Sequence, residues 1–312
     1  MSLFPRPILI DGAEHPAQQF RLMVSDLARD QEGVTRGTDF KVSQLGTPGG
    51  AVQVGSGSGL VRGRVAAFQG TYSCASTAAV NVSIAPTAGV GRSDMLILRV
   101  EDPEYEGTLD PEVDEVAYFQ VISNVSSSAT AIPDGRTGIP LARIDIPSST
   151  ATITDAMITD IRQIANPRRQ RLFLPPQSPS SLSALLGSST SYSYFSTAAG
   201  WNVPVPAWAS QVIVDVRGSG MRLTTADYFG SFRATFGASL TVQPVVIDDN
   251  QGTGTRRIPT ECGDTLTIPD AYRGTTQLLR PQAAGAAGNA GRISVDSSTT
   301  LFADIEFIEA PR

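Results

Sequence analysis

The chain has 312 residues, with 24 Lys or Arg against 30 Asp or Glu, and a formal net charge of −6 at pH 7. An apolar fraction of 41% is ordinary for a folded protein and excludes a largely disordered chain, while the length allows two domains. The acidic balance and the charged fraction of only 17% argue against a nucleic-acid partner, which would require a basic surface. No apolar run is long enough to span a bilayer, so membrane insertion is not expected.

The N-terminal segment predicts an extended arm over residues 1–15, followed by a helix. Pro16 suits the first helical position, and Gly33 marks the end. Two arrangements of the helix remain open: docking on the following β module, or packing against copies of itself in an oligomer. The apolar stripe and candidate oligomer contacts are Phe20, Met23, Val24 and Leu27, preceded by Ala17.

Short apolar runs predict an antiparallel β module over the next 130 residues. Residues 80–84 and 142–146 alternate apolar and polar side chains, as half-buried strands do. Residues 95–100 are apolar except for Arg99, which indicates a central strand covered on both faces. Residues 116–122 add a strand rich in aromatic and β-branched side chains. Gly55-Ser-Gly-Ser-Gly59 indicates a turn or hairpin entry, because no Gly-Lys-Ser/Thr follows as a phosphate loop requires.

The order of these pieces resembles a module of phage minor tail proteins. The resemblance is carried by the glycine-rich entry, Gly70-Thr-Tyr72, the run Arg92-Ser-Asp-Met-Leu-Ile-Leu-Arg-Val100, the run Ile139-Pro-Leu-Ala-Arg-Ile-Asp-Ile146 and the run Ile158-Thr-Asp-Ile-Arg162. It covers about a third of the chain and is most similar to tail-tip or baseplate proteins of long-tailed phages that infect actinobacteria. The resemblance implies a virion structural part, often trimeric, that positions or forms a host-binding element.

Residues 101–115 form the most acidic segment, with eight carboxylates. Such density suits a calcium site or a glycosidase pair. The EF-hand spacing of a glycine at position six and a glutamate at position twelve is not met from Asp110, and glycosidase pairs normally face each other across a cleft. We expect a solvated loop between strands, with calcium as the alternative.

Few residues offer other chemistry. His15 is the only histidine, so a multi-histidine zinc site is impossible and a catalytic triad would have to use this one residue. Cys74 and Cys262 lie far apart in the sequence and are expected to be separate thiols rather than a disulfide. No cofactor or metal is expected, and the chain is interpreted as a non-enzyme.

A domain boundary is expected in the Pro/Ser-rich stretch 167–190, read as a linker between an attachment module (residues 1–166) and a C-terminal domain (residues 191–312). Arg168, Arg169 and Arg171 are expected to pair with carboxylates of a neighbouring domain or subunit. About eight short strands after residue 191 predict a jelly-roll-like β-sandwich. Among its aromatic residues, Trp201 and Tyr228 lie next to loop signals and are the candidate glycan or host contacts.

The sequence therefore predicts a mainly β structural protein of a phage tail tip or baseplate, located in the virion. Its expected partners are further copies of itself, as a trimer, other tail proteins and a host cell-surface glycan. A carbohydrate-binding lectin and a cell-wall polysaccharide depolymerase are the alternatives. A fibrous depolymerase would show a β-helical repeat, which is absent from the sequence.

Overall fold

The computed structural model describes residue 4, residues 6–8 and residues 10–312, so the expected N-terminal arm falls partly outside the described residues. The fold is mainly β, as predicted, with one short N-terminal α-helix. The chain forms two compact units: Met1–Pro167 together with Ala310–Arg312, and Arg168–Glu309. The chain leaves the first unit after Pro167 and returns to it at Ala310.

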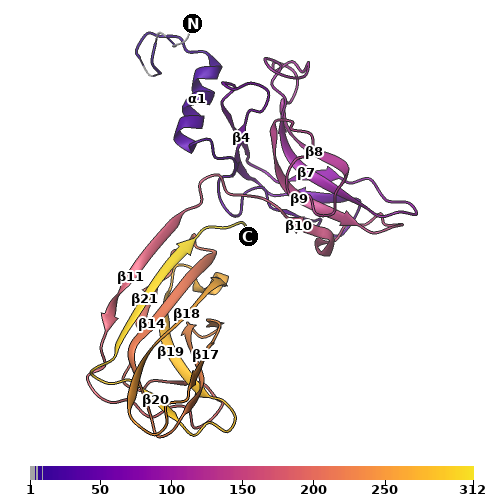
Figure 1. Cartoon of the computed structure of the whole chain (residues 1–312). Helices are drawn as coiled ribbons and strands as arrows, with labels where there is room; N and C mark the ends of the chain where they lie inside the picture. The colour runs from indigo at the N-terminus through magenta and orange to yellow at the C-terminus, as the bar shows by residue number, and fades with distance from the viewer. Residues whose placement is uncertain (1–3, 5, 9) are drawn as a thin grey trace. The chain divides into compact units, whose positions relative to one another are not determined.

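The first unit contains three small antiparallel sheets (Figure 1). Their strand orders are β1-β4-β5, β2-β3-β6 and β10-β9-β7-β8. The elements are α1 (Ala17–Ala28), β1 (Gly33–Val34), β2 (Val42–Gln44), β3 (Ala51–Val54), β4 (Gly57–Arg62), β5 (Thr71–Ser76), β6 (Val80–Ser83), β7 (Arg92–Val100), β8 (Ala117–Val125), β9 (Gly138–Ile146), the 3-10 turn η1 (Asp155–Met157) and β10 (Ile158–Asp160).

Strand β7 is the centre of this unit. It pairs with β8 on one side and β9 on the other. Every residue from Ser93 to Val100 is buried, as expected for a strand covered on both faces. The one long polar side chain, Arg99, donates to the carbonyl of Thr137 and forms an ion pair with Glu106 at 2.8 Å. The apolar run in the sequence was therefore a reliable guide to the core.

Helix α1 docks on the β module, as one of the two predicted arrangements has it, but through its polar side, while Phe20 and Leu27 of the apolar stripe stay exposed. The guanidinium of Arg21 lies over the rings of Tyr72 and Tyr105, 5.2 and 5.3 Å from their centroids, and its Nε donates to the carbonyl of Gln69. The helix backbone passes so close to Gly70 (φ +81°) that a Cβ there would lie 2.6 Å from the carbonyl carbon of Arg21. No helix among the described residues is long and apolar enough to cross a membrane.

The second unit is a β-sandwich of two antiparallel sheets (Figure 1). One sheet has the order β11-β21-β14-β18, with β20 also paired to β14; in the other, β19 pairs with β12, β13 and β15, and β15 with β16 and β17. The elements are β11 (Arg169–Gln177), β12 (Ser193–Tyr194), β13 (Trp201–Pro204), β14 (Gln211–Thr224), β15 (Tyr228–Phe236), β16 (Leu240–Thr241), β17 (Val245–Asp249), β18 (Arg256–Thr267), the 3-10 turn η2 (Asp270–Tyr272), β19 (Thr276–Gly285), β20 (Arg292–Ser294) and β21 (Thr300–Ile308).

The inner faces of the two sheets form one apolar core. Along β21, Leu301, Ala303, Ile305 and Phe307 are buried, while the residues between them are only partly covered. The same alternation along β14 buries Val212, Val214 and Val216. Phe307 packs against Phe236 of the opposite sheet, with ring centroids 6.4 Å apart. A period of two in the sequence thus separates a core face from an outer face in each long strand.

The predicted linker at 167–190 is wrong for most of its length. Residues Arg169–Gln177 form β11, which pairs antiparallel with β21 from Arg169↔Ile308 onward. Pro175 and Pro176 had indicated a linker, but β11 is an edge strand, where proline removes no ladder hydrogen bond, and the register shifts there between Leu174 and Gln177. The remainder is also attached to the sandwich, because Leu186 exchanges backbone hydrogen bonds with Ile293.

The C-terminal boundary also differs from the expected one. Residues 310–312 belong to the first unit rather than to the sandwich. The backbone N–H of Arg312 donates to the carbonyl of Gly37 at 3.0 Å. The carbonyl of Arg312 accepts from Arg162, whose fully buried guanidinium also donates to the carbonyl of Asp39. These contacts fix the returning end of the chain.

Candidate functional site

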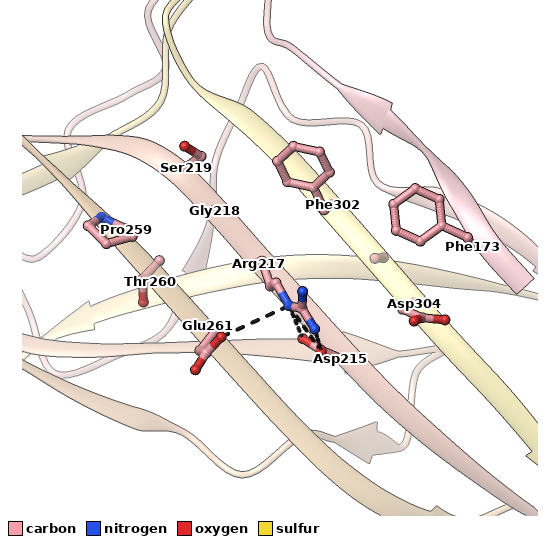
Figure 2. Close-up of a pocket in the computed structure, with 11 residues that line it drawn as sticks. Phe173, Asp215, Arg217, Gly218, Ser219, Pro259, Thr260, Glu261, Phe302 and Asp304 are labelled. Carbon is pink, nitrogen blue, oxygen red and sulfur yellow. Dashed lines mark hydrogen bonds and ion pairs between the residues drawn. The ribbon is translucent and has the colours of Figure 1, made fainter.

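The outer face of the sheet β11-β21-β14-β18 carries a hollow of about 590 Å³, within the range usual for small-ligand sites. Figure 2 shows Phe173 and Phe302 on one side of Arg217, and Pro259, Thr260 and Glu261 on the other. Asp215, Gly218, Ser219, Ala303 and Asp304 complete the lining. We call this hollow the sheet-face groove.

Strand register places the aromatic and charged side chains of the groove in two rows that run across the strands. In one row, Phe173 of β11 pairs with Asp304 of β21, which pairs with Asp215 of β14. In the next row, Arg217 of β14 lies between Phe302 and Glu261. Cross-strand partners have Cβ atoms about 5 Å apart, and rows two residues apart along a strand are separated by roughly 7 Å. One small ligand can therefore contact both rows.

Ion pairs hold the charged groups of the groove in place. Nε of Arg217 donates to both carboxylate oxygens of Asp215, at 3.2 and 3.1 Å, and lies 4.0 Å from Glu261. The hydrogen bonds to Asp215 hold the pKa of Arg217 above its usual range. Arg171 pairs bidentately with Asp304 and keeps the pKa of that carboxyl below its usual range. An ionised, arginine-bound Asp304 is unsuited to general-acid catalysis, which needs a proton to give.

The aromatic wall of the groove is open to solvent. Phe173 is 65% exposed, and Phe302 is half-buried. Alternation along β21 directs Phe302 to the face opposite the buried Phe307. The sequence predicted a strand at Phe302 but a linker at Phe173. Only the pairing of β11 with β21 brings the two rings to one face.

The predicted glycan contacts Trp201 and Tyr228 are core residues, so they are not the exposed platform. Trp201 is 5% exposed and its indole N–H donates to the carbonyl of Pro175 at 2.8 Å. Tyr228 is 0% exposed and its hydroxyl donates to the carbonyl of Ala284 at 2.9 Å. Both rings serve the sandwich core, and both polar atoms are already satisfied inside the unit, as buried Trp and Tyr usually require. Their nearness to turns gave a misleading signal.

The predicted oligomer contacts lie on α1. Phe20 is 42% exposed and Leu27 is 76% exposed, while Met23 and Val24 are half-buried. Helix α1 docks on its own unit through Arg21 and Ser25, and this contact leaves Met23 and Val24 only partly covered. The structure brings these side chains together on one side of α1 and leaves two of them uncovered.

The arginine cluster pairs with carboxylates of the C-terminal domain, as expected, but these pairs lie within one unit because residues 168–177 belong to the sandwich. Arg168 forms a bidentate ion pair with Glu309, and Arg169 contacts Glu306 at 3.2 Å. Arg171 pairs with Asp304, as described above. These carboxylates all belong to or follow β21, the pairing partner of β11. The cluster thus strengthens the edge of the sandwich.

The acidic segment 101–115 lies in the loop between β7 and β8, as predicted. Several of its carboxylates are bound: Asp102 accepts from Tyr72 at 2.7 Å, and Glu101 accepts from Tyr118 at 2.8 Å. Within the described part of the chain, no group of three or more His, Cys, Asp or Glu side chains is placed to hold a metal ion. Both cysteines are free thiols and lie in different units, as expected; Cys262 is buried and Cys74 half-buried.

Comparison with known proteins gives neither a matching family profile nor a matching curated protein. Among solved structures, the infectious bursal disease virus Gx strain aligns over 89% of this chain and 74% of its own, at 11% identity and a TM-score of 0.24. The VP2 subviral particle of that virus gives 12% identity over 90% and 74%, with a TM-score of 0.22. The C-terminal CBM6 of LamC, a marine laminarinase from Zobellia galactanivorans, covers 45% of this chain and 98% of its own, at 12% identity and a TM-score of 0.20. Likenesses of this size assign no function to the chain.

Proposed function

We propose that this chain is a structural protein of a phage tail tip or baseplate, and that its sandwich contacts the host cell surface. The observation that carries the proposal is the sheet-face groove: it exposes an aromatic wall and a charged row that the sandwich core does not use. Exposed aromatic groups beside fixed polar groups are typical of recognition surfaces. The sandwich contributes the groove, and the first unit contributes attachment.

The attachment role of the first unit rests on the sequence resemblance to tail-tip modules. The segments that carry it form β7, β9 and β10, and Gly70-Thr-Tyr72 enters β5. Gly70 and Tyr72 are among the residues that α1 contacts. The stretch that resembles tail proteins is therefore the stretch that organises this unit.

Immunogold labelling of intact phage particles tests the location. Antibody raised against residues 168–309 should label the distal end of the tail, and antibody first absorbed with the purified chain should not. Label on the capsid, or particles that lack the chain altogether, would contradict the proposed role.

Self-association through α1 is a second part of the proposal, with a trimer as the expected state. Tail tips are built around symmetry axes, and a closed ring buries one repeated contact in every subunit. Phe20 and Leu27, apolar and uncovered on α1, suit such a contact. Light scattering should give three times the 32.9 kDa chain mass.

Changing both Phe20 and Leu27 to Asp should convert the trimer of this chain to a monomer. Val113→Asp provides the control, because Val113 is 80% exposed, close to Leu27 at 76%, but lies in the loop between β7 and β8. A wild-type monomer at micromolar concentration would refute the trimer. A trimer that survives the double substitution would move the contact to the β sheets.

Binding rather than catalysis is the proposed activity. Asp215 and Asp304, the two carboxylates that pair across β14 and β21, are each bound by an arginine. Incubation with host cell-wall polysaccharide should therefore release no reducing ends. Release that Asp304→Asn abolishes would establish the depolymerase alternative.

A further inference from the structure

We infer that the sheet-face groove binds an uncharged glycan, with a sugar ring on the wall formed by Phe173 and Phe302 and its hydroxyls on the row formed by Arg217 and Glu261. This inference rests on the proposed host-contact role and names the chemistry of the partner. Three properties of the groove support it: its apolar walls, its free hydrogen-bonding capacity and the sign of its charge.

The walls offer apolar surface of the right kind for a sugar ring. Phe173 and Phe302 stand on neighbouring strands β11 and β21, and Pro259 stands across the groove on β18 (Figure 2). The C–H faces of a pyranose are apolar and pack on aromatic rings, while its edge carries the hydroxyls. A sugar ring that lies between the two walls, with polar groups along its edge, can use both features at once.

The polar row keeps hydrogen-bonding capacity for a ligand. Glu261 is mostly exposed, and its ion pair with Arg217 is as long as 4.0 Å. Arg217 donates to Asp215 from both Nε and Nη2, but its side chain is more than half exposed and its Nη1 remains for a ligand. A carboxylate that accepts and a guanidinium that donates, side by side, match the donor and acceptor pair of vicinal hydroxyls. Because Asp215 fixes Arg217, this arrangement exists before the ligand arrives.

Charge selects among glycans. The lining contains three carboxylates, Asp215, Glu261 and Asp304, and one guanidinium, Arg217. Arg171, which pairs with Asp304 at the rim, leaves one negative charge in excess. A uronic, sulfated or phosphate-bearing polymer would meet like charge.

The same charge argues against the rival occupant, a second copy of this chain. If two copies met face to face through the groove, two surfaces of the same net negative charge would meet. Like charges placed together in an interface cost binding energy. An uncharged ligand avoids that cost and still uses the walls.

The test uses the full-length chain in affinity gel electrophoresis. The uncharged probes are soluble dextran, mannan and arabinogalactan, and dextran sulfate is the anionic counterpart of the first. We expect retardation by at least one uncharged probe, and none by dextran sulfate. Lack of retardation by all three uncharged polymers, or stronger retardation by dextran sulfate than by dextran, would overturn the inference.

Variants locate the binding. Phe173→Ala and Phe302→Ala should each raise the dissociation constant for the polymer that retards the chain by about 3- to 10-fold, the range expected for one lost ring contact. Phe229→Ala is the matched control, because Phe229 is an exposed ring on β15 of the opposite sheet. Equal losses in all three variants would place the binding outside the groove. Unchanged tryptophan fluorescence confirms that each variant is folded.

The outcome separates this inference from the proposed function. If the chain binds none of the polymers but adheres to host cells, and Phe173→Ala abolishes that adhesion, the host-contact role is supported and the glycan ligand is refuted. If the chain binds an uncharged polymer through the groove but is not found on the tail, the glycan ligand is supported and the role in the virion is refuted.

Discussion

Two phenylalanines of the sandwich should differ sharply in their contribution to stability. Phe307 is fully buried and packs on Phe236, whereas Phe173 is 65% exposed on the outer face. Phe307→Ala removes a buried ring and leaves a cavity, which costs about 3–5 kcal/mol. Phe173→Thr keeps a good strand former on the edge strand and should cost less than about 1 kcal/mol.

Urea unfolding followed by tryptophan fluorescence measures this difference in the sandwich alone. Both tryptophans of the chain, Trp201 and Trp208, lie in the second unit, so the signal does not report on the first. With a slope near 2 kcal/mol per molar urea, Phe307→Ala should lower the midpoint by roughly 2 M, and Phe173→Thr by less than about 0.5 M. Equal shifts in the two variants would refute the assignment of Phe173 to a free outer face.

Three further outcomes are expected. Burial raises the pKa of Cys74 to about 11 and of Cys262 to about 12, so a thiol reagent at pH 8 should label both much more slowly in the native protein than after urea unfolds the chain; equal rates in the two states would contradict the raised pKa values. Hydrogen bonds from Arg143 hold the pKa of Asp145 below its ordinary value, so its stabilising effect is present above about pH 4 and is lost as pH falls through the lowered pKa. Asp145→Asn should therefore flatten the acid-side fall in melting temperature, and an unchanged pH profile would argue against the ion pair. Arg162→Met removes the donor to the buried carbonyl of Asp39 and to the carbonyl of Arg312, and it should destabilise the first unit by about 1–3 kcal/mol, measured by circular dichroism, while the tryptophan transition stays in place.

Local sequence patterns were sufficient where burial depends on neighbours along the chain. The apolar run of β7 and the alternation of β21 both predicted strands correctly, because a period of two reports directly on the faces of a strand. The helix was also predicted within a few residues. Its orientation was not, because the contact of Arg21 with Tyr72 and Tyr105 joins segments 51 and 84 residues apart.

The groove could not be predicted for the same reason. It depends on the pairing of β14 with β21 and of β21 with β11, strands separated by 70 residues or more. Nothing in the local pattern around Phe173, with Pro175 and Pro176 beside it, indicates an edge strand rather than a linker. The prediction that Trp201 and Tyr228 are exposed was wrong for the opposite reason. Residues typical of turns flank both positions, yet both rings are buried in the core.

Adhesion of the labelled full-length chain to host cells tests the central claim most directly. The wild-type chain and the Phe229→Ala variant should bind the cells with the same saturation curve, and the double variant Phe173→Ala/Phe302→Ala should bind with an affinity at least 10-fold lower. All three proteins should show the same tryptophan fluorescence. Equal binding by the double variant, or failure of the wild-type chain to bind, would contradict a host contact through the outer face of the sandwich.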